Sequence, residues 1–554
     1  MAEGESSAMP LSVTAPGEST GSSSSSSNCR LLISGGGLAA ATYCLAAAVL
    51  ARPILAEAEL LALDESTTSL MALAAGALVG QGAFGELADR RSRLLSLRGT
   101  AAFMLVGCTG CALAGGSLQR RLLGPAALRG ELALWHVLLG LGLGGEYPAA
   151  TAFVVEVNSG APVQGGRGSA HALAVAYLYM ASGQLLAAIL AVALAVAQSA
   201  AQDLAWRLLF LAGALLALAS LAMRLRCTAQ DATQAASGAA GGLALVCRSS
   251  RHLRRTLAGT CVAWLLQSAA SCGLTLEAAR ASFAPHGDSG LAGAETALLV
   301  VLMSLPGYSA AFTLARCSRR AIQFVGFGAM AVCFAALAAV IDLPRSQGVQ
   351  IALYSLLQMV NAGGAGAATR FVPAEVFPAC VRASCLGLSA AAGSIGALAA
   401  SALLPRLCEA AGPQLALVMC ALVSGLGVAC TALLTPKYNT DVVQKIDRLR
   451  PGKGMRECTL EALERGSPYR ECPGCGVMVL REGGCNLITC ANPNCQDVWC
   501  FACGGRGCRT WACASVEAAR SPALDILPHL LWPAYVGAHH LEQQRASVPL
   551  VEVN

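Results

Sequence analysis

Charged side chains are scarce in this sequence. Asp, Glu, Lys and Arg make up 13% of the 554 residues and aromatic residues 5%, whereas an average soluble domain has about 25% charged residues. Hydrophobic residues reach 55%. The net charge of +6 is small and spread along the chain, and no nucleic-acid-binding module is recognisable, so we do not expect a nucleic-acid partner. The composition predicts a multi-pass membrane protein and not a large soluble one.

The N-terminus lacks the features of a signal peptide. Residues 1–28 are rich in Ser, Gly and Glu, with an unbroken run at Ser22–Ser27, and they contain neither a basic nor an apolar region. We therefore expect a disordered tail over residues 1–30. Most cysteines before residue 440 lie scattered in apolar runs, where Cys behaves as a small hydrophobic residue.

Long apolar stretches are abundant. A membrane-spanning helix needs about 20 mostly apolar residues, and the sequence offers twelve candidates. If all twelve are correct, the basic links after the second, sixth, eighth and twelfth lie on one side, and the positive-inside rule places both termini in the cytosol. The candidates cover residues 32–51, 67–88, 99–116, 132–155, 169–197, 205–223, 255–276, 295–315, 321–341, 349–371, 384–405 and 413–435.

The chain contains an internal repeat. A glycine-, acid- and arginine-bearing link, residues 82–93, joins the second and third candidate helices, and a related link, residues 307–319, joins the eighth and ninth. An acid followed by an arginine also ends the fourth and tenth candidates. Two six-helix halves with matching links predict a transporter whose halves rock about a central site.

The acids and arginines in these links are placed to form ion pairs when one side of such a protein is closed. The alternative is that the basic links reflect topology alone. We favour a gate, whose predicted charges are Asp89, Arg90, Arg93, Glu156, Arg167, Glu375 and Arg382.

Four motifs carry a family resemblance. The pattern Gly85-x-x-x-Asp-Arg-x-x-Arg93 resembles the signature link of the major facilitator superfamily. Residues 144–148, Gly-Gly-Glu-Tyr-Pro, resemble a motif of its phosphate:proton symporter branch, as do residues 373–393 and the segment from Gly259 to Trp264. The resemblance implies an all-α membrane protein with twelve transmembrane helices in two pseudo-symmetric bundles. These would be residues 31–224 and 255–435, joined by a cytosolic linker, residues 225–254.

Glu146 is the acid at the centre of the fourth candidate helix. A carboxylate there costs roughly 2.5–3.5 kcal/mol on insertion scales and normally faces a partner or a pathway. Packing alone is the alternative. We expect Glu146, Tyr147 and Trp264 to line the central cavity as a substrate or proton path.

The expected cavity departs from the phosphate symporters it resembles. In the alignment suggested by the resemblance, several polar side chains of the phosphate symporters are replaced in this chain, and the Lys of their cavity is replaced by Ser394. Arg370 is one possible replacement cation, but we expect its side chain to reach the cytosolic surface. The cargo therefore stays open between phosphate, another ion and a sugar. The other altered positions are Ala41, Cys44, Ser268, Cys272 and Gly366.

The segment after residue 470 has the cysteine spacing of zinc ligands. Two Cys-x-x-Cys pairs with cysteines between them are a strong zinc signal, and a segment this short needs metal to fold. A disulfide cluster is the alternative, which the expected cytosolic location disfavours. We predict bound Zn²⁺ and no organic cofactor. The cysteines of this segment are Cys472, Cys475, Cys485, Cys490, Cys495, Cys500, Cys503, Cys508 and Cys513.

This cysteine pattern resembles the terminal module of RING-in-between-RING ubiquitin ligases. The resemblance implies two Zn²⁺ ions, held by Cys472, Cys475, Cys490, Cys495, Cys500, Cys503, Cys508 and Cys513, with a His among His529, His539 and His540 as the alternative to the last two cysteines. The resemblance places the ubiquitin acceptor at Cys485, but the helping His of the ligases is Leu487 here, and no upstream RING is present. The predicted role of the finger, residues 471–513, is therefore to bind ubiquitin-system or other proteins. Residues 436–470 would be a linker and residues 514–554 a tail.

The sequence thus predicts a secondary-active transporter in a lipid bilayer, fused to a cytosolic zinc finger. The alternatives are a membrane-anchored ubiquitin ligase acting through Cys485 and a solute sensor that does not transport. The sequence does not fix the cargo, the coupling ion, the membrane, or whether both modules belong to one transcript.

Overall fold

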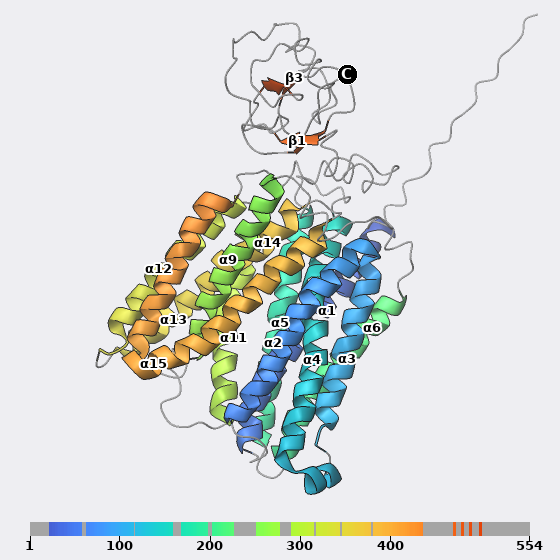
Figure 1. The fold of residues 1–554 in the computed structure, drawn as a ribbon, viewed down its shortest axis with the longest axis vertical. Coiled ribbons are helices and arrows are strands. Elements are labelled where there is room, and N and C mark those ends of the chain that lie inside the picture. Colours follow the sequence, from blue (N-terminus) through green and yellow to red (C-terminus); the bar gives the residue numbers. More distant parts are fainter. Residues whose placement is uncertain are drawn as a thin grey trace, which may run out of the picture.

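The computed structural model is a bundle of long, roughly parallel helices (Figure 1). The structure describes residues 22–57, 63–115, 117–158, 168–197, 202–226, 251–276, 290–314, 317–343, 346–377, 381–435, 469–471, 478–480, 487–489 and 498–500.

The first group of helices packs mainly within itself, with α4 against α2 and α3, and α1 against α5 and α6. These are the blue to green helices on the right of Figure 1. They are α1 (Ser22–Glu57), α2 (Leu63–Arg90), α3 (Arg93–Leu113), α4 (Ser117–Asn158), α5 (Gly168–Ala197) and α6 (Gln202–Arg226).

The second group also packs within itself, chiefly α15 against α9 and α12. We call the two groups the first half and the second half. The second half consists of α9 (Arg251–Leu276), α11 (Gly290–Leu314), α12 (Arg319–Val340), α13 (Gln347–Val360), the π-turn η1 (Asn361–Ala365), α14 (Gly366–Val376) and α15 (Arg382–Leu434).

α15 contains a sharp bend. Gly412 has φ 83° and ψ 164°, a backbone conformation that residues with a β-carbon rarely adopt. Pro405 and Pro413 flank it, and the helix changes direction at the lower left of Figure 1. α15 therefore consists of two helices that meet at Gly412, and these correspond to the last two candidate spans, 384–405 and 413–435.

Each of the other predicted spans also falls largely within one or more of these helices. Eight helices among the described residues are long and apolar enough to cross a membrane. The all-helical, multi-pass architecture is thus confirmed, while the number of twelve spans stays a prediction. α1 begins at Ser22, inside the segment predicted to be a disordered tail.

Glycines let α2 and α4 approach to backbone contact. A β-carbon on Gly76 or Gly80 of α2 would overlap carbonyl oxygens of α4, and one on Gly140 or Gly144 of α4 would overlap those of α2. Small residues provide close packing where lipid gives no hydrophobic drive for helix association. The glycine-rich stretch around Glu146 thus places that carboxylate inside the first half.

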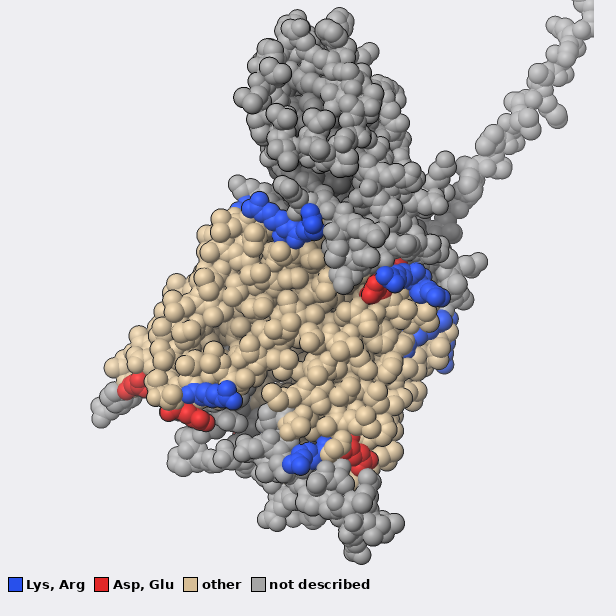
Figure 2. Space-filling view, viewed as in Figure 1, with Lys and Arg blue, Asp and Glu red and all other residues tan. Residues whose placement is uncertain are grey.

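Charged side chains on the visible face gather near the two ends of the helical bundle, with an uncharged band between them (Figure 2). This distribution is typical of a membrane-spanning protein. Many large apolar side chains of the bundle are exposed, among them Val79, Leu215 and Val332, as expected for helices that face lipid.

Two short β-hairpins follow the bundle in the chain. β1 (Tyr469–Glu471) pairs antiparallel with β2 (Met478–Leu480), and β3 (Leu487–Thr489) pairs antiparallel with β4 (Val498–Cys500). The connection of the first hairpin holds Cys472 and Cys475, and that of the second holds Cys490 and Cys495.

Candidate functional site: a charged latch and a buried arginine between two halves

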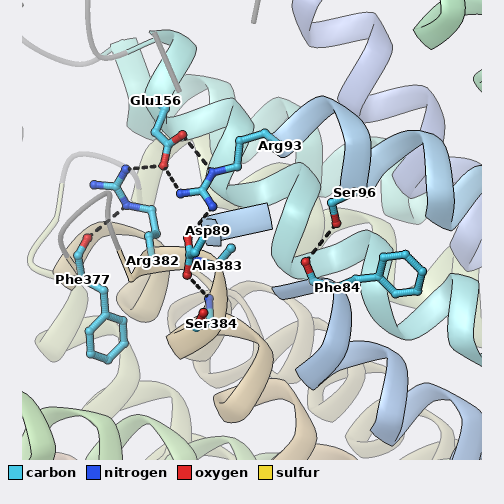
Figure 3. A network of polar contacts seen from close by, with 9 residues as sticks. All are labelled: Phe84, Asp89, Arg93, Ser96, Glu156, Phe377, Arg382, Ala383 and Ser384. Atoms are coloured by element: carbon cyan, nitrogen blue, oxygen red, sulfur yellow. Dashed lines mark hydrogen bonds and ion pairs between the residues drawn. The ribbon is translucent and has the colours of Figure 1, made fainter. Parts of the chain in front are cut away.

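Arg93, the first residue of α3, lies between two carboxylates (Figure 3). Its guanidinium pairs with Asp89 one turn earlier in the chain, at the end of α2, and donates to Glu156 through Nε at 3.1 Å and Nη2 at 2.8 Å. Arg93 and Asp89 are each 1% exposed. Bidentate pairs of this kind are strong and directional, so the ends of α2, α3 and α4 are held together.

The same cluster bridges to the second half. Arg382, the first residue of α15, donates from Nη1 to Glu156 at 3.2 Å and from Nε to the carbonyl of Phe377 at 3.1 Å. The Asp89 carboxylate accepts the backbone N–H groups of Ala383 at 3.2 Å and Ser384 at 2.6 Å.

These backbone contacts cap a helix from outside its own half. The first N–H groups of a helix have no partner within it, and α15 has no side-chain cap of its own at Val381. A carboxylate at this position also interacts favourably with the helix dipole. We call Asp89, Arg93, Glu156 and Arg382, together with the start of α15, the latch.

Backbone contact between α2 and α15 accompanies the latch. A β-carbon on Gly85 would lie 2.6 Å from the carbonyl oxygen of Ala383, and one on Gly387 would overlap the carbonyl oxygen of Gln81. Only glycine at these positions lets the two halves come this close.

The second half has a counterpart of the Arg93–Glu156 pair. Arg319, at the start of α12, donates to both oxygens of Glu375 in α14 at 3.0 Å. Arg93 at the start of α3 pairs with Glu156 near the end of α4, and Arg319 at the start of α12 pairs with Glu375 near the end of α14, so the two pairs occupy corresponding places in the two halves. Our sequence analysis grouped Glu375 with Arg382, but the structure joins Arg382 to Glu156 and Glu375 to Arg319. Arg319 lies in the repeat and was therefore identifiable from the sequence.

The two remaining predicted gate charges are Arg90 and Arg167. Arg90 forms an exposed pair with Glu86 one turn earlier in α2, at 2.7 Å. Arg167 falls outside the described residues.

Glu146 lies in a second ion pair, entirely within the first half. It is fully buried, accepts from Arg224 Nη1 at 2.9 Å and from the Thr100 hydroxyl at 2.6 Å, and also pairs with Arg224 Nη2. A methyl group on Gly37 would overlap both charged groups. Glu146 thus joins α1, α3, α4 and α6. In the sequence, Arg224 belongs to the basic link after the sixth candidate helix, and no pattern identified it as the partner of Glu146.

Tyr147 and Trp264 meet each other across the two halves. Their rings form an edge-to-face pair with centroids 5.3 Å apart, and the Tyr147 hydroxyl donates to the carbonyl of Arg370 at 3.0 Å. Glu146 and Tyr147 are adjacent in sequence but face different neighbours, because successive residues of a helix point in different directions.

The side chain of Arg370 is half-buried and turns back along α14 to donate to the carbonyl of Gly366 at 2.9 Å, whereas we expected it to extend to the cytosolic surface. Its guanidinium lies 5.8 Å from the ring centroid of Tyr177 in the first half and 5.9 Å from that of Trp264. Polar contacts across the halves surround this region. Tyr177 donates to the carbonyl of Ala362 at 2.9 Å, Tyr308 to Gln184 at 3.3 Å, and Gln81 to Ser394 at 2.9 Å. Sequence patterns did not single out these tyrosines and glutamines.

The predicted zinc ligands and the candidate acceptor Cys485 lie outside the described residues, except for the backbone of Cys500 in β4. Within the described part of the chain, no group of three or more His, Cys, Asp or Glu residues could hold a metal ion.

The sequence is similar to phosphate transporters. It is 28% identical over 434 residues to the probable inorganic phosphate transporter 1-6 of Arabidopsis thaliana, covering 67% of this chain and 82% of the relative. Over a shorter stretch of 110 residues it is 43% identical to the probable inorganic phosphate transporter 1-10 of Oryza sativa subsp. japonica, covering 19% of this chain and 20% of that protein.

A family model described as "Sugar (and other) transporter" matches residues 291–449. Among solved structures, the proton:xylose symporter XylE bound to 6-bromo-6-deoxy-D-glucose is similar, with a TM-score of 0.62 and 15% identity over 74% of this chain and 96% of that one. The chain has the fold of the major facilitator superfamily, and its sequence is similar to inorganic phosphate transporters.

Proposed function

We propose that this chain is a secondary-active transporter that moves a small anion across a membrane by alternating access, with inorganic phosphate as the first candidate cargo. The observation that carries the proposal is the latch. Charges from the first half hold the start of α15 in the second half, at one end of the bundle (Figure 3).

The latch contacts have the properties of a two-state gate. They are buried ion pairs and charge-assisted hydrogen bonds, which are discrete and either made or broken. Each bias of about 1.4 kcal/mol changes the ratio of closed to open states tenfold. A few such contacts therefore suffice to close one end until a bound solute or a proton shifts the balance.

Phosphate is the candidate cargo because the relatives named above are described as inorganic phosphate transporters. Two features of this chain extend the range of candidates to other anions. Its predicted cavity lacks the Lys that the resemblance implies at Ser394, and it holds Arg370 in the same interhelical region.

The test is uptake by proteoliposomes that contain the purified full-length chain. Labelled phosphate, a hydroxycarboxylate such as malate, and xylose should be offered with and without a pH gradient. Uptake of an anion above that of protein-free liposomes supports the proposal. Binding without uptake or counterflow would instead indicate a solute sensor.

We propose as a second function that residues 471–513 form a zinc finger that binds ubiquitin-system proteins. The two antiparallel hairpins favour it, because each places a pair of the predicted ligands in the connection between its strands, as zinc-binding turns require. Metal analysis of the purified protein should give two zinc ions per chain. Self-ubiquitylation in vitro that is lost in Cys485→Ala would favour the ligase alternative, and the absence of zinc would exclude the finger.

A further inference from the structure

Arg370 is a half-buried cation that neither the latch nor the Glu146 pair uses. Its Nη1 donates to the carbonyl of Gly366 at 2.9 Å, and its guanidinium lies 5.8 Å from the ring centroid of Tyr177 and 5.9 Å from that of Trp264. Within the described part of the chain it forms no ion pair with Asp or Glu. Because a guanidinium stays charged and withdrawing a charge from water is costly unless it is paired, an anion from outside the chain would stabilise it.

Gly366 makes room beside this guanidinium. It follows the π-turn Asn361–Ala365, and its N–H donates to the carbonyl of Asn361. A β-carbon at Gly366 would lie 2.5 Å from that carbonyl oxygen, 3.3 Å from Arg370 Nη1 and 3.4 Å from Gln267 Nε2. The π-turn thus excludes a side chain between Arg370 and Gln267. Insertions of this type occur frequently at functional sites.

Gln267 supplies a second, independent indication of a ligand. It is 3% exposed, and its Nε2 donates to Ser271 at 2.8 Å and to Asn361 at 3.0 Å. Its carbonyl oxygen is buried and accepts no hydrogen bond from any described residue. Since buried acceptors are normally satisfied, this oxygen would accept a hydrogen bond from a donor group on a ligand.

The position between the halves suits a transported ligand. Arg370 belongs to the second half, yet it lies against Tyr177 of the first half, whose hydroxyl holds the π-turn through Ala362. A ligand bound here would interact with residues of both halves, which is where carriers with repeated halves bind their substrates.

We propose that Arg370 and Gln267 form the binding centre for a small anion that also carries an O–H donor. The anionic group lies on the guanidinium, and the hydroxyl donates to the Gln267 carbonyl oxygen. Dihydrogen phosphate and hydroxycarboxylates share this chemistry, whereas a neutral sugar would leave the charge of Arg370 unpaired. The inference rests on the proposed transport function, and it adds the O–H donor that the anion must carry and the residues that select it.

Binding to the purified full-length chain in detergent tests this inference separately from transport. The probes are labelled phosphate, malate and xylose. The variants are Arg370→Gln, Arg370→Lys and Gln267→Met, with Arg406→Gln as a matched control because Arg406 is an exposed arginine of α15.

We expect Arg370→Gln to weaken anion binding at least about tenfold, since hydrogen bonds to charged groups are the strong ones. Arg370→Lys should give an intermediate loss, because Lys keeps the charge without the planar fork. Gln267→Met should also weaken binding, and Arg406→Gln should leave it unchanged. Tighter binding of phosphate would identify an inorganic ligand, and tighter binding of malate would identify an organic one.

Anion binding that is equal in Arg370→Gln and the wild type would overturn the inference, as would xylose binding with no anion binding, or no binding of any probe. If Arg370→Gln does not elute as a folded species, Arg370→Lys and Gln267→Met decide. Anion binding that depends on Arg370, without uptake by proteoliposomes, would support this site and contradict the proposed transport function.

Discussion

The carboxylate of Asp89 accepts the backbone N–H of Ser384 at 2.6 Å. One residue ends a helix of the first half and the other begins a helix of the second half, so the contact exists only while this end of the bundle is closed. Its strength depends on the negative charge of Asp89 as well as on its shape.

Replacing Asp89 with Asn should open this end of the protein more often. The variant keeps the side-chain size but loses the charge that pairs with Arg93 and caps α15. Hydrogen bonds to charged groups contribute about 1.5–3 kcal/mol, so amide hydrogen exchange at Ala383 and Ser384 should accelerate about 10- to 100-fold. Mass spectrometry of the peptide containing both residues measures this.

Glu86→Gln is the matched control for Asp89→Asn. Glu86 lies one turn earlier in α2, and its pair with Arg90 is exposed, where an ion pair contributes about 0–1 kcal/mol. Exchange at Ser384 should be unchanged in this control. Equal exchange in Asp89→Asn and the wild type would show that the latch does not hold the two halves.

Glu156→Gln and Glu375→Gln should have different effects. Glu156 pairs with arginines of both halves, whereas Glu375 pairs with Arg319 inside the second half. Removing one partner of a buried ion pair lowers the free energy of unfolding by about 3–5 kcal/mol. We expect faster exchange at the start of α15 chiefly in Glu156→Gln, and lower thermal stability of the second half in Glu375→Gln. Identical exchange patterns in the two variants would contradict separate roles for these pairs.

Gly85→Ala should separate the halves without changing any charge. The new methyl group would lie 2.6 Å from the carbonyl oxygen of Ala383, whereas at Gly82, one turn earlier, a β-carbon would meet nothing within 4 Å. Gly82→Ala is therefore the control and should transport like the wild type. A spin-label distance across the latch end should lengthen in Gly85→Ala only. An unchanged distance would mean that α2 and α15 tolerate the methyl group by local shifts.

Glu146 should act on the stability of the first half. Glu146→Gln leaves the buried Arg224 without its ion-pair partner, which should lower the free energy of unfolding by about 3–5 kcal/mol. Combining Glu146→Gln with Arg224→Met should recover much of this loss, because no buried charge then remains unpaired. The apparent Tm in detergent measures both, with exposed Glu295→Gln as the control. A single variant with normal Tm and lost proton dependence of uptake would instead place Glu146 in the proton path.

Sequence patterns predicted the helices well because apolar length and small-residue spacing determine them locally. The internal repeat also identified Asp89, Arg93, Glu156, Glu375 and Arg382 as charges at helix ends. It did not predict their pairing, because the partner of an arginine depends on how two helices face each other. Arg319 was thus overlooked as the partner of Glu375.

The direction of the Arg370 side chain was mispredicted for a related reason. A long basic side chain near a helix end usually extends to the surface, but the π-turn Asn361–Ala365 alters how the residues that follow it face their neighbours. A five-residue π-turn leaves no periodic signal in the sequence, so the direction of the Arg370 side chain could be determined only from the structure.

Uptake into proteoliposomes by the wild type and by Asp89→Asn tests the central claim most directly. The account predicts anion uptake by the wild type above protein-free liposomes. It also predicts uptake reduced about tenfold or more in Asp89→Asn, although this variant still binds the anion. No anion uptake by the wild type, or equal uptake by both proteins, would contradict transport through a latch between the halves.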